Sequence, residues 1–232
     1  MTAAVLVAGS RGGIGGAVIA ELGRRGVAVA GFDRDEFDIT SPGGAEQAVE
    51  WALGVHGEIC GVVHAIGMSG RALGDGSVLD CSDEAWSEVH RVNLQSVLRL
   101  LRASMPALVE RRGGSVVVIG SGLASTLDDD FLTVAYAAAK GALVPLVRSA
   151  AFTGAPHGVR VNLVSPGVVD TPMAARAVTD PTISARLAAL QPLAAGPQAP
   201  DSVAATVAWL LSEESAAITG ANVPADGGWT LR

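Results

Sequence analysis

The stretch Ala4–Gly16 reads AVLVAGSRGGIGG and carries the clearest fold signal in the chain. Its first part, Ala4–Ala8, is a short continuous apolar run, which is typical of a strand buried on both faces of a sheet. Residues 17–25 follow the glycines and place apolar side chains at helical spacing. A strand, a glycine turn and a helix in this order are the context that a dinucleotide-binding loop requires, although such a turn can also serve packing alone.

Asp33 stands at the end of the second apolar run, Val27–Phe32, and lies about 20 residues beyond the glycine loop. A carboxylate at this place accepts hydrogen bonds from the adenosine ribose and repels a 2′-phosphate, so Asp33 favours NAD over NADP. Arg11 and Arg34 argue the other way, because a nearby cation can hold a 2′-phosphate. We weigh Asp33 more heavily because of its position at the strand end.

The rest of the chain alternates between short apolar runs and amphipathic segments. Ser41 and Pro42 are expected as the N-cap and the first residue of one helix. Further strands are expected at 59–66, 115–119, 159–164 and 221–225, with helices at 42–55, 82–110, around 136–140 and at 201–212. This alternation indicates an α/β fold, a doubly wound parallel sheet of about seven strands with helices on both faces, in one domain over residues 1–232.

Composition excludes several classes of partner. The formal net charge is −7, which argues against nucleic acid and anionic membranes as main partners. No apolar run approaches the ~20 residues of a membrane span, and no basic leader precedes the first apolar run. Cys60 and Cys81 lack the spacing of a metal site. We therefore expect a cytoplasmic protein with two reduced thiols and no metal.

Tyr136 and Lys140 are the only tyrosine and the only lysine in the chain. On a helix this spacing places both side chains on one face, one turn apart. A phenol has a pKa of about 10, and an ammonium group close to it lowers that pKa, so the pair predicts a proton donor and acceptor that works near neutral pH. Such pairs also arise by chance, so other motifs must decide.

Several motifs in this order and spacing resemble the classical short-chain dehydrogenase/reductase family over nearly the whole chain. They are Gly9-x-x-x-Gly13-Ile14-Gly15, Asn93 within Val92-Asn93-Leu94, Ser121 after Val118-Ile119-Gly120, Tyr136-x-x-x-Lys140, Ser165-Pro166-Gly167 with Thr171-Pro172-Met173, and Ile218-Thr219-Gly220 with Asp226-Gly227-Gly228. The resemblance implies a Rossmann-type fold and hydride transfer between a nicotinamide cofactor and a secondary alcohol or ketone.

The resemblance also implies the roles of individual residues. Tyr136 exchanges the proton with the substrate, and Lys140 binds the nicotinamide ribose and lowers the pKa of Tyr136. Ser121 holds the substrate oxygen, and Asn93 anchors a water that connects Lys140 to solvent. The implied cofactor contacts are Gly9, Ser10, Arg11, Gly13, Ile14, Gly15, Asp33, Arg34, Asp38, Ile39, Ala65, Gly67, Tyr136, Lys140, Pro166, Gly167, Val168 and Thr171. Among these, Asp38 and Ile39 are expected to face adenine, and Val168 and Thr171 to hold the carboxamide.

Two positions depart from the family pattern. Ala8 stands where the family's loop begins with Thr, and His64-Ala65-Ile66-Gly67 stands where the family has Asn-Asn-Ala-Gly. We interpret both changes as altered local scaffolding, because these two elements normally touch through the Thr hydroxyl. His64 as a catalytic base is the alternative interpretation.

The substrate side is expected to involve the segment around 172–200 as a lid. Its leucines and prolines predict a neutral, apolar substrate, such as a cyclic or aromatic alcohol of the hydroxysteroid or dihydrodiol kind, unless they are ordinary helix core. Asp128–Asp130 is expected to face the entrance and disfavour anionic substrates, or else to be a solvated loop tip.

Two other functions remain open at this point. The first is an NADPH-dependent carbonyl or 3-oxoacyl reductase, and the second is a non-catalytic nucleotide-binding protein. The joint presence of Ser121, Tyr136, Lys140 and Asn93 argues against the second. The family further implies a homotetramer or homodimer that assembles through the helices of Asn93 and Tyr136 and through the last strand.

Overall fold

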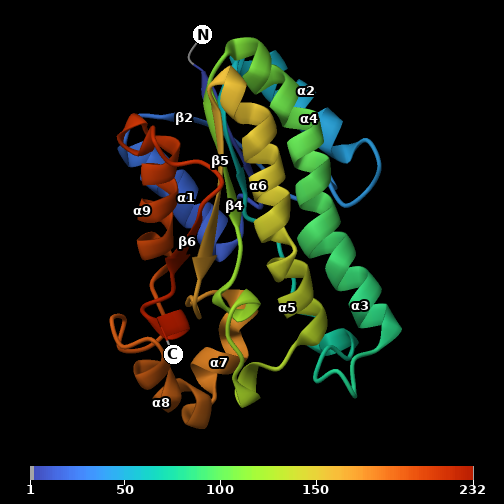
Figure 1. Cartoon of the computed structure of the whole chain (residues 1–232), viewed down its shortest axis with the longest axis vertical. Coiled ribbons are helices and arrows are strands. Elements are labelled where there is room, and N and C mark those ends of the chain that lie inside the picture. The colour runs from blue at the N-terminus through green and yellow to red at the C-terminus, as the bar shows by residue number, and fades with distance from the viewer. Residues whose placement is uncertain (1–2, 232) are drawn as a thin grey trace.

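Six apolar runs form one parallel sheet in the computed structural model of the chain, which describes residues 3–231 (Figure 1). Along the sheet the order is β2-β1-β3-β4-β5-β6. The connections change side between β1 and β3, and ligands bind outside the carboxyl ends of the strands at such a switch point. The strands are β1 (Ala4–Ala8), β2 (Ala28–Phe32), β3 (Ile59–His64), β4 (Gly114–Ile119), β5 (Val159–Pro166) and β6 (Asn222–Ala225).

The sheet confirms the doubly wound α/β fold but corrects its size. About seven strands were expected, and the described residues form six. Each of the six apolar runs in the sequence is one strand. Residues 33–43 lead from β2 directly to the next helix without a further strand. The sheet therefore has no seventh strand beside β2.

Helices cover both faces of the sheet (Figure 1). On one face α1 (Gly13–Arg24) packs against α9 (Pro200–Leu211), and on the other lie α2 (Gly44–His56), α4 (Ser96–Arg111) and α6 (Leu143–Gly154). Residues of β1 alternate between the two cores: Val5 and Val7 join the side of α1 and α9, and Leu6 and Ala8 join the side of α2, α4 and α6. This alternation is the period of a strand that is buried on both faces.

The helix expected at 82–110 is divided into three parts. It begins with α3 (Asp83–His90), where the Ser82 hydroxyl accepts a hydrogen bond from the Ala85 amide at 3.0 Å. A π-helical turn, Arg91–Gln95, then precedes α4. Such turns interrupt the regular hydrogen-bond ladder and are frequent at functional sites. Asn93 lies in this turn.

The start of one other helix also differs from expectation. Gly43, and not Ser41, precedes α2, because the Ser41 hydroxyl donates to Asp38 instead of capping the helix. The helix expected around 136–140 is α5 (Val134–Gly141), and α6 begins after a short break at Leu143. Pro145 explains the break, since it has no N–H to donate to the Gly141 carbonyl and crowds that turn.

Two short helices, α7 (Ala175–Thr179) and α8 (Pro181–Leu190), project beyond the carboxyl ends of the strands (Figure 1). Ile183 and Leu187 of α8 pack with Phe131 and Trp229, from other segments, in a small separate core. Among the described residues, none of the helices has the length and apolar character needed to cross a membrane. Cys60 and Cys81 are both free thiols.

Candidate active site

A cleft at the carboxyl ends of the strands brings the predicted catalytic residues together. Ser121 follows β4, and Tyr136 and Lys140 come from α5; all three line the cleft. Besides Tyr136 and Lys140, seven predicted cofactor contacts line the same cleft, although they come from three segments of the chain: Ile14, Ala65, Gly67, Pro166, Gly167, Val168 and Thr171. The strands therefore deliver residues that are distant in sequence to one place.

Tyr136 is partly buried, and Ser121 is its polar neighbour. Burial raises the pKa of the phenol, and a hydrogen bond with Ser121 opposes that rise. The start of α5 is fixed by Asp75, whose carboxylate accepts hydrogen bonds from the amides of Ala135 and Tyr136 at 2.9 and 3.0 Å. The sequence gives no sign of this contact, because Asp75 is far away along the chain and has no local signature.

Lys140 is only 3% exposed, and its Nζ donates to the Ile119 carbonyl at 2.8 Å. Burial lowers the pKa of its ammonium group to about 8. Nζ lies 5.8 Å from the centre of the Tyr136 ring. Burial is the largest cause of the shift at Tyr136 and Lys140 is not among its causes, so the expected lowering of this pKa by Lys140 stays a prediction for the protein with cofactor bound.

Asn93 is fully buried and holds the loop after β3. Its Oδ1 accepts from the Met68 amide and its Nδ2 donates to the Met68 carbonyl, both at 3.0 Å. A Cβ on Gly67 would lie 3.0 Å from Asn93 Oδ1 and 3.6 Å from Lys140 Nζ. Asn93 and Lys140 thus both lie close to Gly67, and both polar atoms of the Asn93 side chain are hydrogen-bonded to the backbone of Met68.

The glycine loop is fitted closely against the end of β3. Gly9 has a φ of +84°, and a Cβ there would lie 2.9 Å from the backbone of Ala65. A Cβ on Gly15 would lie 1.9 Å from the Gly9 carbonyl oxygen. Side chains at these two positions would push the loop away from the switch point. This geometry leaves the start of α1 open to an anionic group, as a dinucleotide pyrophosphate requires.

Asp33 lies beside this loop, next to Arg11 and Arg34, the two arginines that favour NADP. Its carboxylate accepts hydrogen bonds from the amides of Arg11 and Arg34, at 3.1 and 2.9 Å. The Arg11 guanidinium is paired with Asp35 at 3.2 Å and with Glu36 at 2.7 Å. Arg34 is 76% exposed and lies 4.0 Å from Asp38. The charge of Arg11 is therefore balanced, and that of Arg34 is largely free.

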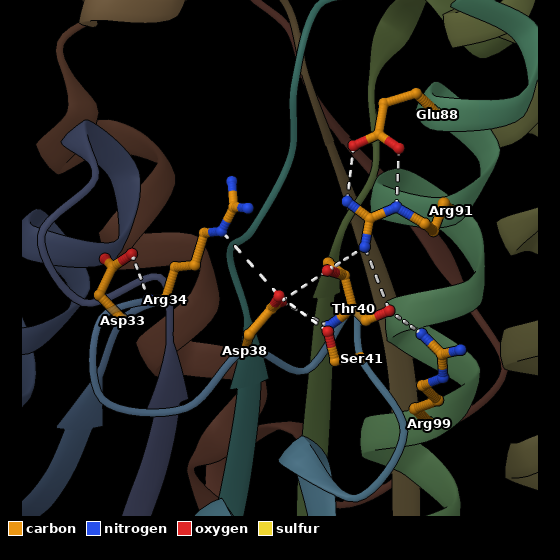
Figure 2. Close-up of polar contacts among 8 residues, drawn as sticks. All are labelled: Asp33, Arg34, Asp38, Thr40, Ser41, Glu88, Arg91 and Arg99. Atoms are coloured by element: carbon orange, nitrogen blue, oxygen red, sulfur yellow. Dashed lines mark hydrogen bonds and ion pairs between the residues drawn. The ribbon is translucent and has the colours of Figure 1, made fainter. Parts of the chain in front are cut away.

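The Asp38 carboxylate forms hydrogen bonds within its own loop (Figure 2). It accepts hydrogen bonds from the Thr40 amide and hydroxyl and from the Ser41 hydroxyl. Burial raises the pKa of this carboxyl, but these hydrogen bonds outweigh it and leave the pKa below its usual value. Arg91 and Arg99 reach across from the helix of Asn93 to the Thr40 carbonyl, and Glu88 holds Arg91 in place (Figure 2).

Ile39 is 1% exposed and belongs to the main core. Its side chain therefore points into the protein, so only the backbone of Ile39 is left to face adenine, and the expected contact stays a prediction. Sequence alone does not distinguish a core isoleucine from one that lines a pocket.

His64 is not placed to act as a base. It is 1% exposed, and its Nε2 lies 2.8 Å from the Ser96 hydroxyl, which itself donates to the Val92 carbonyl. The imidazole must therefore donate from Nε2. Burial, assisted by the charge of Lys140, lowers its pKa to about 3. His64 does not line the cleft, so the scaffolding interpretation fits the structure.

The substrate side of the cleft contains residues that sequence analysis missed. Phe131 and Trp229 stack edge to face, with ring centres 5.0 Å apart, and form an apolar wall. Arg71 and Arg176 also line the cleft. No motif pointed to these side chains, because three separate segments and the end of the chain bring them together.

Asp128 and Asp130 do not present free charge at the entrance. Arg186 of α8 pairs with Asp128 at 2.7 Å and also with Asp130. Only Asp129 is exposed. The expected repulsion of anionic substrates by three free carboxylates is therefore not supported, and two of the carboxylates instead connect this loop to α8.

A parallel sheet with a glycine loop at its switch point, and a serine, a tyrosine and a lysine in one cleft, defines a class of nucleotide-dependent oxidoreductases. The sequence profile described as enoyl-(acyl carrier protein) reductase matches residues 16–230. The chain belongs to the classical short-chain dehydrogenase/reductase family.

Individual relatives support this assignment. The 3-oxoacyl-[acyl-carrier-protein] reductase FabG of Escherichia coli is 31% identical over 96% of this chain and 95% of its own length. The 2-(S)-hydroxypropyl-CoM dehydrogenase 3 of Xanthobacter autotrophicus is 31% identical over 97% and 96%. A solved short-chain type dehydrogenase/reductase from Mycobacterium ulcerans is 27% identical, with a TM-score of 0.88 over 100% of this chain and 92% of that chain.

Proposed function

We propose that this oxidoreductase transfers a hydride between NAD(H) and a secondary alcohol or ketone. The observation that carries the proposal is the meeting of Ser121, Tyr136 and Lys140 in a cleft that continues into the glycine loop region. The nicotinamide supplies or accepts the hydride when it is bound. The names of the two sequence relatives describe a reductase of 3-oxoacyl groups and a dehydrogenase of a hydroxypropyl group.

In this proposal Tyr136 exchanges a proton with the substrate oxygen, and Ser121 donates a hydrogen bond to the same oxygen. Burial keeps the pKa of Tyr136 above its ordinary value, so the phenol is protonated at neutral pH and suited to donate when a ketone is reduced. Lys140 is close enough to the floor of the cleft to donate to the nicotinamide ribose. Asn93 positions the loop of Gly67 and Met68, which lies beside Lys140.

NAD is the cofactor that the adenine end supports best. Asp33 keeps lone pairs for ribose hydroxyls beyond the two amides that it accepts, and the charge of Arg11 is balanced by two acids. The specific observation in favour of the second candidate, an NADPH-dependent 3-oxoacyl or carbonyl reductase, is the largely free charge of Arg34. Residues 172–200 serve as the substrate lid in either case.

Turnover of a panel of ketones and secondary alcohols with NAD(H) and NADP(H) in parallel tests both assignments. We expect NAD(H) to be preferred, and Asp33→Asn to move the ratio of kcat/KM toward NADP(H) by roughly 10-fold, because the repulsion of the 2′-phosphate is removed. Arg24→Gln, on the exposed part of α1, is the matched control. A preference for NADP(H) in the wild-type protein would overturn the assignment of NAD.

We also propose that the chain assembles as a homodimer or homotetramer. The support is an exposed apolar face on α3 and α4, where Trp86 is 45% and Leu98 is 39% exposed. Sedimentation of the purified protein measures the assembly directly.

A further inference from the structure

The charges that line the cleft are all positive. Arg71, Lys140 and Arg176 contribute to its surface, and among the described residues no aspartate or glutamate does. This contrasts with the whole chain, whose formal net charge is −7. Lys140 has a place in the reaction proposed above, but the two arginines do not.

Arg71 and Arg176 converge from different segments. Arg71 begins a short 3-10 helix after β3, and Arg176 lies on α7. Nη2 of Arg71 donates to the Asp130 carbonyl at 3.1 Å, and Nη2 of Arg176 donates to the same oxygen. Two guanidinium groups that share one oxygen must lie close to each other, and their like charges repel. A carbonyl dipole balances only part of that charge.

No carboxylate within the described residues forms an ion pair with either arginine. Asp75 is near Arg71, but it is buried and accepts from the amides of Ala135 and Tyr136. Asp128 and Asp130 are paired with Arg186. The N–H groups of Arg71 and Arg176 that are not bonded to the Asp130 carbonyl can therefore bind an external anion.

The apolar wall lies beside this pair. The Cζ of Arg176 lies 5.9 Å from the centre of the Phe131 ring, and Phe131 stacks on Trp229. Ser121 and Tyr136 line the same cleft. A molecule that places its reacting carbon at Tyr136 and its body along Phe131 and Trp229 would bring its far end to the two arginines.

We propose that Arg71 and Arg176 form a subsite for an anionic group of the substrate. The substrate is then an oxo or hydroxy compound with an apolar body and a carboxylate, sulfonate or phosphate at the end away from the reacting carbon. Guanidinium groups suit such planar or tetrahedral anions because they donate paired hydrogen bonds. This inference rests on the proposed function, and it replaces the neutral substrate expected from the sequence.

Binding to the NAD⁺-loaded protein tests the subsite without turnover. The probes are 4-acetylbenzoate and its methyl ester, two ketones with the same ring and acetyl group that differ in charge and in one methyl group. By calorimetry we expect the wild-type protein to bind the carboxylate roughly 10-fold more tightly than the ester. Arg71→Gln with Arg176→Gln should abolish this preference, and Arg71→Lys with Arg176→Lys should retain part of it. Arg148→Gln, on α6 and outside the cleft, should leave it unchanged.

The outcomes separate the two proposals. Equal affinity for carboxylate and ester in the wild-type protein, or a preference that survives the double glutamine variant, overturns the anion subsite. Weaker binding of NAD⁺ by the double variant, with the preference intact, would assign the arginines to the cofactor and also overturn it. If the NAD⁺-loaded protein prefers the carboxylate probe but no ketone tested is reduced in the presence of NADH, the proposed hydride transfer fails and the subsite stands.

Discussion

Lys140 holds an ammonium group in a site that is almost closed to solvent. One carbonyl, that of Ile119, accepts its hydrogen bond, and burial lowers its pKa to about 8. The folded protein therefore carries a cost at neutral pH for keeping this group charged. Such a cost is typical of a functional site, where a charge is kept for a ligand instead of for stability.

The pKa of Lys140 leads to a prediction about stability. Between about pH 8 and pH 10.5 the folded chain binds fewer protons at this residue than the unfolded chain, so the free energy of unfolding rises with pH. Relative to Lys140→Met, the wild-type protein should gain on the order of 2 kcal/mol between pH 7 and pH 9.5. Chemical denaturation of both proteins at the two pH values measures it. A difference that does not change with pH would show that the pKa is ordinary.

Sequence motifs identified Ser121, Tyr136, Lys140 and the glycine loop, because these residues occur in a fixed order with fixed spacing. They could not identify Arg71, Arg176 or Trp229. These residues enter the cleft from separate segments, and exposed arginines elsewhere in the chain look the same in sequence. His64 shows the opposite case, in which a residue with reactive chemistry is buried and neutral.

At the level of elements, the strands were predicted well and the helix boundaries less well. A strand that is buried on both faces leaves a continuous apolar run in the sequence. The π turn at Arg91–Gln95 leaves no comparable mark, and the end of α5 depends on a single proline. The start of α2 was misplaced because Asp38 competes for the Ser41 hydroxyl.

The pairing of α8 with the loop before α5 leads to a second prediction. Arg186→Gln removes the ion pairs to Asp128 and Asp130, and the Asp128 side chain is only 9% exposed. We expect a stability loss of roughly 1–2 kcal/mol and faster hydrogen exchange across residues 175–190, because α8 loses both of its ion pairs to this loop. KM should rise more than kcat falls.

Arg111→Gln is the control for this variant, because it breaks an ion pair with Glu58 on another part of the surface. It should leave exchange in residues 175–190 unchanged. Unaltered exchange in Arg186→Gln would show that apolar packing of Ile183 and Leu187 alone holds α8 in place.

For the molecule as a whole, the order β2-β1-β3-β4-β5-β6 explains why the sites lie where they do. The switch point between β1 and β3 opens a space for the glycine loop, and β4 and β5 carry Ser121 and the Pro166–Val168 segment to the same edge. The alternation of strands and helices made this architecture predictable. The number of strands could not be predicted, because it depends on residues 33–43, which lead from β2 to α2 without forming a strand.

The adenine end and the helix of Asn93 are connected across the molecule. Arg91 and Arg99 donate hydrogen bonds from that helix to the Thr40 carbonyl, and the Asp38 carboxylate accepts a hydrogen bond from the Thr40 amide (Figure 2). Asn93, two residues from Arg91, holds Met68 beside the cleft. One helix thus positions both ends of the proposed cofactor site, which motif spacing could not show.

The most direct test of the proposed function is single-turnover hydride transfer in Tyr136→Phe, with a ketone that the wild-type protein reduces. This variant removes one hydroxyl group and keeps the ring. We predict that hydride transfer slows by at least ~100-fold while the Kd for NADH stays within about 3-fold of the wild-type value, because the phenol supplies the proton and not the cofactor site. Hydride transfer at close to the wild-type rate would contradict the role of Tyr136.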